Sequence, residues 1–356
     1  MPGPAYVNSP CVFAFKLLAL GGLAVSATGC GTLSYLLQAG RGQLAIINRA
    51  RPIDEVLKDE TIPTRIKTLL REVPAIKQYG ESQGLRPTPN YRDYVQLDRS
   101  AASYVVAACR PLKFEAKSWS FPIVGSFPYL GWFDLDAAKA YAKELRHEDW
   151  DVELRGARAF STLGWFRDPI LSSMIPDTDE TLGDLVNVIL HESVHATYYV
   201  SGQSYFNESL ADFVAGQLTP TYLAQAHGVD SEPLRAYTKS EVEGQAREKD
   251  FRTSYAELER LYASSAPDVE KLERKAKMLG DLKTRLGFKR DINNATLVQF
   301  KTYGSGKQEF QTLLRACGGE WARFWRAINR IDGSALGTPQ QQNLGPALLR
   351  QAQGGC

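Results

Sequence analysis

The sequence predicts an α+β protein in which helices predominate. Apolar residues recur at helical spacing between about residues 33 and 79, and again from about 177 to 332. Short runs rich in β-branched and aromatic residues are confined to the part between these stretches. Strands that are grouped together in the chain, with helices before and after them, indicate a small mixed or antiparallel sheet within a mostly helical fold.

Residues 1–30 have the features of a signal peptide. The apolar run at residues 17–25 follows Lys16 and is too short to span a bilayer as a mature helix. The run ends in Ser-Ala-Thr-Gly-Cys at residues 26–30, which resembles a bacterial lipobox. In that motif the cysteine is diacylated and becomes the new N-terminus, so we expect Cys30 to carry a lipid anchor. An uncleaved N-terminal anchor, or cleavage near Ala27, is the alternative.

The residue after Cys30 and the overall charge narrow the location and the partners. Gly31 stands where an aspartate would indicate inner-membrane retention in the enterobacterial manner, so the sequence favours an outer-membrane anchor that faces the periplasm. The formal net charge is only +2, and no basic stripe is present, which argues against a nucleic-acid partner.

Outside the signal and the lipid site, three cysteines remain. One disulfide can form in an oxidising periplasm, but the sequence does not choose its pair among Cys109, Cys317 and Cys356.

The part of the chain before residue 170 supplies the expected sheet. A turn at Arg110-Pro111 joins two of its strands, and an edge strand there could align a peptide along a cleft by backbone pairing. The motif Gly-Trp-Phe occurs at residues 131–133 and 164–166, where core or rim packing is a commoner role for the tryptophans than cleft lining. The expected helices are 33–57, 64–79 and 136–145, and the expected strands are 103–108, 112–121, 150–154 and 159–162.

A buried helix is predicted from about residue 179 to about residue 200. Asp177 and Glu180 have the spacing of a capping box, and Gly202 is a candidate C-cap. Between them runs a broad apolar stripe of Leu182, Leu185, Val186, Ile189 and Leu190. This helix carries the most informative motif of the chain, the sequence His-Glu-Ser-Val-His at residues 191–195.

The spacing of that motif is typical of a metal site. His191 and His195 lie at i and i+4, so both imidazoles can reach one ion from the same face of the helix. Glu192 follows the first ligand and is the candidate general base that takes a proton from an activated water. The alternative is a surface helix with two solvated histidines, but the chain has only four histidines and two of them fall here.

A second motif, Asn-Glu-Ser-Leu-Ala-Asp at residues 207–212, resembles the zincin metallopeptidases of the gluzincin group. By that resemblance Glu208 is the third metal ligand, and Asp212 is the carboxylate that orients a ligating histidine. The two acids lie at i and i+4 on one helix face, as a ligand and its supporting acceptor require. Only residues 196–207 separate His195 from Glu208, fewer than in the better-known members, so a tight turn at 201–205 must join the two helices.

From about Cys30 to about Trp325 the chain is similar to the bacterial putative zinc aminopeptidase family of lipoproteins. The resemblance rests on the lipobox-like start, the Arg51-Pro52-Ile53 segment, the paired Gly-Trp-Phe motif and the two metal motifs. It implies a zincin-like metallopeptidase domain at 31–332, with one zinc ion per chain and a peptide as substrate. Its parts are a sheet-containing region at about 31–170, active-site helices at about 177–219 and a helical lobe at about 231–332.

The expected reaction is peptide hydrolysis, in which Glu192 deprotonates water and later protonates the leaving amine. A donor beside the metal should stabilise the oxyanion, and the candidates are Tyr303, Tyr205 and Tyr199, with a weak preference for Tyr303 in the C-terminal lobe. An endopeptidase is the first alternative to an aminopeptidase, since no residue can be assigned to bind a substrate amine. A non-catalytic envelope lipoprotein that retains the zincin fold is the second.

The last third of the chain reads as helical until residue 332. Residues 232–262 and 268–286 are predicted to form an antiparallel hairpin, with a narrow apolar seam that includes Phe251 and Leu258. A partner-binding coiled coil is the less favoured interpretation of these residues, because the seam lacks a sustained heptad. Further helices are expected at 294–303, 309–317 and 321–331. The Gly- and Gln-rich tail at 333–356 is predicted to be disordered.

Overall fold

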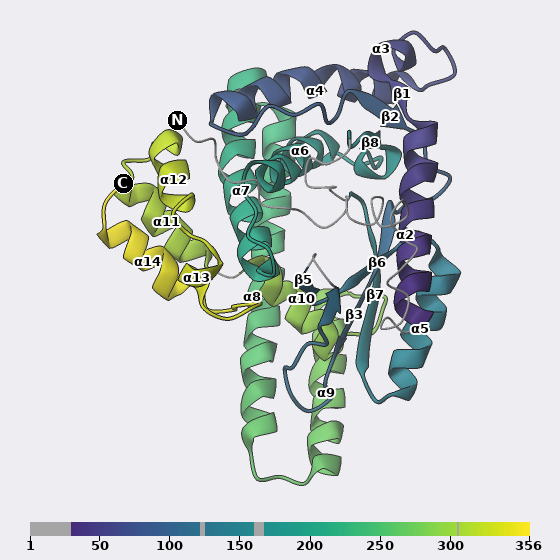
Figure 1. Cartoon of the computed structure of the whole chain (residues 1–356), viewed down its shortest axis with the longest axis vertical. Helices are drawn as coiled ribbons and strands as arrows, with labels where there is room; N and C mark the ends of the chain where they lie inside the picture. The colour runs from purple at the N-terminus through teal and green to yellow at the C-terminus, as the bar shows by residue number, and fades with distance from the viewer. Residues whose placement is uncertain (1–29, 122–124, 160–166, 305) are drawn as a thin grey trace, which may run out of the picture.

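The computed structural model describes residues 30–121, 125–159, 167–304 and 306–356, without the side chains of 30–34, 125 and 301–304. In these residues the fold is a predominantly helical α+β one, which confirms the predicted class (Figure 1). The proposed signal peptide, most of the strand expected at 159–162 and the second Gly-Trp-Phe motif lie outside the described residues. None of the described helices combines the length and the apolar character that crossing a membrane requires.

The N-terminal helix is shorter than expected. Helix α2 (Cys30–Arg49) ends before β1 (Arg51–Pro52), which pairs antiparallel with β2 (Asp93–Val95), and β2 pairs in parallel with β8 (Ile170–Leu171). Pro52 lacks the N–H that would continue a helix, and the residue before a proline prefers extended backbone. The expected helix over 33–57 is therefore interrupted by a strand. Short α3 (Ile53–Val56) and long α4 (Thr64–Ser82) follow.

A second sheet has the order β6-β3-β7, formed by Leu130–Trp132, Ser103–Cys109 and Asp151–Ala157, and is antiparallel throughout. Helix α5 (Leu135–His147) packs against it, and β4 (Trp119–Phe121) forms a separate hairpin with β5 (Gly125–Phe127). The strand expected at 112–121 is thus confined to its last three residues. The chain after Pro111 turns back on itself instead, where Lys117 N donates to Ala108 O at 2.8 Å.

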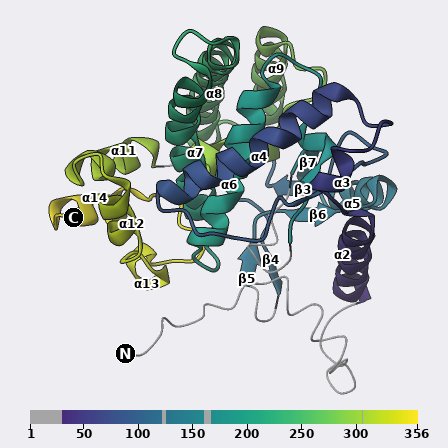
Figure 2. The same ribbon diagram turned by 90° about the horizontal axis from the view of Figure 1, so that it is seen from above.

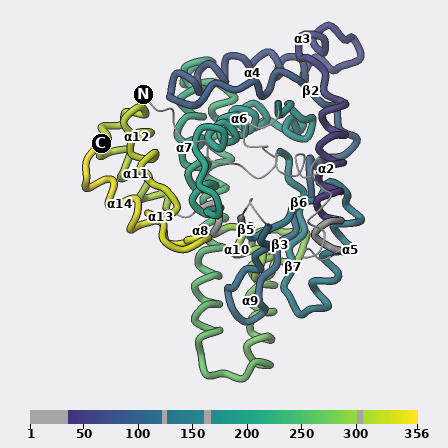
Figure 3. Tube along the Cα trace, viewed as in Figure 1, coloured from purple at the N-terminus to yellow at the C-terminus, as the bar shows by residue number. Residues whose placement is uncertain are grey.

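The outer edge of β6 is covered by α2, which the Cα trace shows alongside it (Figure 3). The side-chain amide of Gln38 donates to Gly131 O at 3.3 Å and accepts from Phe133 N at 3.1 Å. It takes the place that a peptide unit of a neighbouring strand would occupy. One turn on, Gly42 meets the Phe133 ring so closely that a Cβ would collide with it. This edge is therefore occupied by the protein itself.

Helices α6 (Thr181–Thr197) and α7 (Ser204–His227) form a hairpin at the centre of the molecule, and α4 crosses over α6 (Figure 2). The apolar side chains of α6 lie in the main core, where Leu185, Ile189 and Val194 are fully buried. The helix begins at Thr181, later than expected. The capping box does not form, because Asp177 pairs with Arg65 at 2.9 Å and Glu180 makes no side-chain cap.

Helices α8 (Glu232–Ala263) and α9 (Asp268–Leu286) form the predicted hairpin, whose connected end projects from the body (Figure 1). Phe251 and Leu258 of the seam are buried against α9 and against α10 (Asn294–Gly304). The amphipathic pattern is therefore accounted for by packing within the chain.

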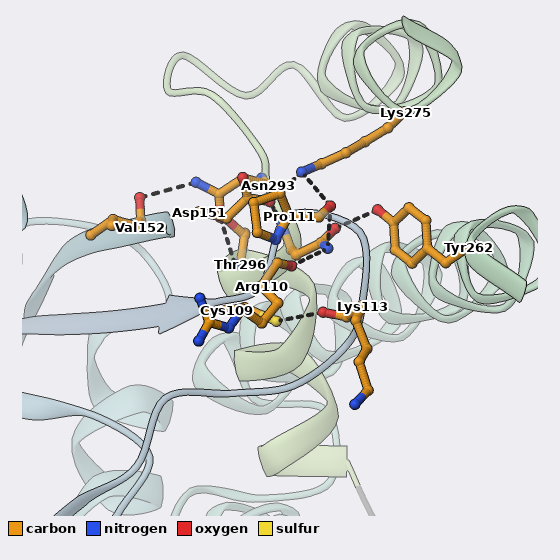
Figure 4. A network of polar contacts seen from close by, with 11 residues as sticks. Cys109, Arg110, Pro111, Lys113, Asp151, Val152, Tyr262, Lys275, Asn293 and Thr296 are labelled. Atoms are coloured by element: carbon orange, nitrogen blue, oxygen red, sulfur yellow. Dashed lines mark hydrogen bonds and ion pairs between the residues drawn. The ribbon is translucent and has the colours of Figure 1, made fainter. Parts of the chain in front are cut away.

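A buried polar network joins this helical part to the β6-β3-β7 sheet (Figure 4). Lys275 of α9 pairs with Asp151 of β7 at 2.5 Å and donates to Pro111 O at 2.8 Å. The same carboxylate accepts from Asn294 N at the start of α10 at 2.9 Å. The Asn294 side chain in turn accepts from the Tyr262 hydroxyl at 2.7 Å. Polar groups from α8, α9, α10 and the sheet are thus hydrogen-bonded to one another.

The C-terminal tail is folded, which corrects the expectation of disorder. After α11 (Lys307–Ala316) and α12 (Trp321–Ile328), residues 333–356 form α13 (Gly333–Leu336) and α14 (Gly345–Gln353). Leu344 and Leu348 are buried against α11, and a disulfide joins Cys317 to the last residue, Cys356. Composition alone underestimates the order of this segment, because a few apolar residues and one cross-link fix it. Cys109, the third candidate, is a buried free thiol.

Candidate metal centre

The hairpin of α6 and α7 brings three candidate ligands together. His191 Nε2 lies 3.1 Å from His195 Nε2, and Glu208 Oε2 lies 3.4 Å and 3.7 Å from these two nitrogens. The ligand atoms of the three residues all lie within 4.8 Å of one another. The i, i+4 spacing on α6 accounts for the two imidazoles, and Glu208 near the start of α7 supplies the carboxylate.

The short turn between the helices is held by Asn207, the first residue of the second motif. Its side chain accepts from Val200 N and donates to Val200 O, both at 2.8 Å, and it is 1% exposed. Gly202 has a φ of +72°, a left-handed conformation that favours glycine. Asn207 therefore fixes the start of α7 relative to the end of α6, and with it the position of Glu208 opposite the histidines.

The tail also secures this turn. Gln340 N donates to Gly202 O at 2.9 Å, and its side-chain oxygen accepts from Ser204 N at 3.1 Å. The amide nitrogen of Gln340 donates to Ser126 O at 2.6 Å, so the same residue reaches strand β5. The folded tail therefore connects the turn between the two ligand helices with the sheet side of the site.

Asp212 supports His191 from the next turn of α7. Its Oδ1 lies 3.0 Å from His191 Nδ1, so Nδ1 carries the proton and, in the neutral ring, the Nε2 lone pair faces the other two ligands. Such a carboxylate partner is typical of metal-bound histidine. His195 differs, since its buried Nδ1 has no hydrogen-bond partner among the described residues.

The electrostatics of the three candidate ligands raise the pKa of one imidazole, that of His191. Burial acts to lower the pKa of His191, but hydrogen bonds to Asp212 and Glu208 raise it well above its ordinary value. Burial acts to raise the pKa of Glu208, yet the neighbouring histidines hold it far below its usual range. Since a metal needs neutral imidazoles, its binding to this site must release protons.

Glu192 lies beside the ligands and is 8% exposed. Its buried Oε2 has no hydrogen-bond partner among the described residues. A buried carboxylate oxygen without a donor is costly, so its retention calls for a group that the chain does not provide. Burial and the nearby charges of Glu192 and Asp168 also raise the pKa of Tyr91 well above its ordinary value.

The donor set fits a divalent transition metal. Two imidazole nitrogens and one carboxylate oxygen lie close together, which is the ligand set of a catalytic zinc site with three protein ligands. The supporting bond from Asp212 and the unpartnered Glu192 oxygen agree with such a site.

The three tyrosines proposed as oxyanion donors differ in where they lie relative to the site. The side chain of Tyr303 lies outside the described residues. Tyr205 is 1% exposed, and its hydroxyl accepts from Gln342 of the tail at 3.3 Å, so it has a packing role. Tyr199 lies in the turn after α6. The sequence analysis missed Tyr129, whose hydroxyl reaches Glu208 Oε1 at 3.4 Å from a position 79 residues earlier in the chain.

Comparison with known proteins agrees with the motif resemblance at the family level. Residues 34–342 match the family described as "Putative aminopeptidase". The match spans most of the chain, so the protein belongs to this family, and the family indicates a peptidase-like function. Neither the curated proteins nor the solved structures include a significant match.

Proposed function

We propose that the protein is a zinc-dependent peptide hydrolase of the aminopeptidase type. The observation that carries the proposal is the convergence of His191, His195 and Glu208 on one point, with the buried and unpartnered Glu192 oxygen beside them. A structural site needs no such base, so Glu192 argues against a non-catalytic scaffold. Family membership supports the aminopeptidase assignment.

The residues of the site have distinct roles in this proposal. His191, His195 and Glu208 would hold the ion, which supplies Lewis acidity toward the scissile carbonyl and acidifies a water. Glu192 accepts a proton from the attacking water and returns it to the leaving amine. Asp212 keeps His191 in the tautomer that presents Nε2 to the ion.

Digestion of a peptide library by zinc-loaded protein, followed by mass spectrometry, tests the reaction class. We expect release of single residues from free N-termini, and no cleavage of the same peptides after N-acetylation. Cleavage at internal bonds would instead assign an endopeptidase. Absence of any cleavage, with zinc bound, would reject the hydrolase.

Metal analysis tests the ligands separately from turnover. We expect one zinc ion per chain in the wild type and markedly weaker binding in Glu208→Ala. A matched control is Glu72→Ala on α4, a partly buried glutamate outside the triad that pairs with His227, which should keep the wild-type affinity. Unchanged zinc affinity in Glu208→Ala would exclude Glu208 as a ligand.

We further propose that acylation of Cys30 anchors the protein to the outer membrane of a bacterial envelope, with the domain in the periplasm. The support is the lipobox-like sequence that ends at Cys30 and the glycine that follows it. Two or three acyl chains give stable anchoring, at roughly 0.8 kcal/mol for each buried methylene. Fatty-acid labelling should be lost in Cys30→Ser, and labelling that persists unchanged would contradict the proposal.

A further inference from the structure

We infer that Tyr129 is a positioning residue for the metal ligand Glu208, an inference that rests on the proposed metal site. Tyr129 lies between β5 and β6, on the sheet side of the site and opposite the helix hairpin that carries the ligands. Its hydroxyl donates to Glu208 Oε1 at 3.4 Å. No sequence motif includes this tyrosine.

The two oxygens of Glu208 face different groups. Oε2 points to the histidine nitrogens, at 3.4 Å and 3.7 Å, whereas Oε1 faces the tyrosine hydroxyl. The side chain of Glu208 is only 14% exposed, so water cannot easily replace either partner. A hydrogen bond on Oε1 leaves Oε2 as the oxygen that faces the ion and holds the carboxylate plane in place.

The position of Tyr129 is fixed from both sides. Immediately after it, Leu130 pairs with Val106 in the β6–β3 ladder. Shortly before it, Ser126 O accepts from Gln340, and Gln340 also bonds the turn between α6 and α7. The backbone near the tyrosine and the turn between the ligand helices therefore share one anchor, Gln340. A rigidly placed donor restricts the motion of a ligand before the metal arrives.

The consequence is a tighter metal site. Loss of an outer hydrogen bond to a ligand typically lowers metal affinity about 10- to 100-fold. We expect Tyr129→Phe to lower the affinity for Zn²⁺ and Co²⁺ by this factor, because the phenyl ring retains the packing and removes only the donor. With Oε1 released, the carboxylate can bind the metal through both oxygens, so the visible absorption spectrum of the Co²⁺ protein should also change.

The test is a metal titration of the full chain, in competition with a chromophoric chelator, for the wild type, Tyr129→Phe and Tyr141→Phe. Tyr141 is the matched control, because its hydroxyl accepts from Trp119 Nε1 at 2.6 Å in the same sheet region without touching the triad. We expect loss of affinity and a changed Co²⁺ spectrum in Tyr129→Phe alone, with the urea midpoint of the metal-free protein unchanged.

Other results have separate meanings. Wild-type affinity and spectrum in Tyr129→Phe would overturn the inference while leaving the metal site intact. An equal loss in Tyr141→Phe, or a lowered urea midpoint in Tyr129→Phe, would also overturn it, because the effect would then be structural. A wild type that binds no metal would reject the proposed function itself.

Discussion

Two buried polar clusters in this protein differ in how completely their polar atoms are paired by hydrogen bonds within the chain. In the network around Asp151, Oδ2 accepts from Lys275 and from Asn294 N, and the Asn294 side chain accepts from Tyr262 (Figure 4). In the centre around His191, two imidazole nitrogens and one carboxylate oxygen converge on one another, and Glu192 Oε2 has no partner among the described residues.

The difference shows what each cluster does. A saturated network stabilises the fold, because any lost partner leaves a buried group uncompensated. A cluster of two imidazoles and a carboxylate that converge on one point can exchange a proton for a cation, and is expected where a protein binds one. The comparison predicts that mutations in the two clusters have opposite effects. Mutations in the network around Asp151 should lower stability, and mutations in the centre around His191 should lower metal binding or turnover.

The largest effect should come from Glu192→Gln. The amide keeps the size of the side chain but cannot accept a proton from water, so we expect hydrolysis to fall by at least about 10²- to 10⁴-fold. Zinc content and the free energy of unfolding should remain close to those of the wild type. Kinetics on a fluorogenic amino-acid amide measure the loss of hydrolysis, and metal analysis measures the zinc content. A variant with wild-type turnover would contradict the role of Glu192.

Lys275→Met should show the opposite signature. The methionine retains much of the packing but leaves the Asp151 carboxylate, with its side chain 17% exposed, without its cation. We expect the free energy of unfolding to fall by about 3 kcal/mol, as for broken buried pairs. Urea unfolding checks this value, while zinc affinity at low temperature should not change. The exposed pair of Arg274 and Glu270 is the control, because Arg274→Met should cost less than about 1 kcal/mol.

A smaller effect is expected for Asp212→Asn, which keeps the shape but weakens the acceptor for His191 Nδ1. Zinc affinity should fall by about 10- to 100-fold. The free energy of unfolding of the metal-free protein should change little. Competition titration measures the first quantity and urea unfolding the second. If Asp212→Asn instead lost stability and kept its zinc affinity, the metal centre would behave like the structural network and the contrast would fail.

The sequence predicts the ligand set because its spacing is local. His191 and His195 lie one turn apart on a helix, and so do Glu208 and Asp212, so helical periodicity alone determines which side chains share a face. The hairpin that brings the two pairs together follows from the short link between them. Asn207 is part of the recognised motif, but its role in holding that link is visible only from its bonds to Val200.

The remaining features depend on contacts between distant residues, which no local pattern encodes. Tyr129 meets Glu208 through the placement of a sheet, and Gln340 reaches the ligand turn from a tail that its composition marks as disordered. The edge of β6 is covered because Gln38, more than 90 residues earlier in the chain, bonds to Gly131 and Phe133. The capping box expected before α6 does not form, and Asp177 instead pairs with Arg65, which is distant in sequence.

The most direct test of the metal centre is X-ray diffraction from crystals of the zinc-loaded protein, recorded on both sides of the zinc absorption edge. Our account predicts one strong anomalous peak per chain, enclosed by His191 Nε2, His195 Nε2 and Glu208 Oε2. Absence of a peak at this position, or a peak held by other residues while this triad stays empty, would contradict it.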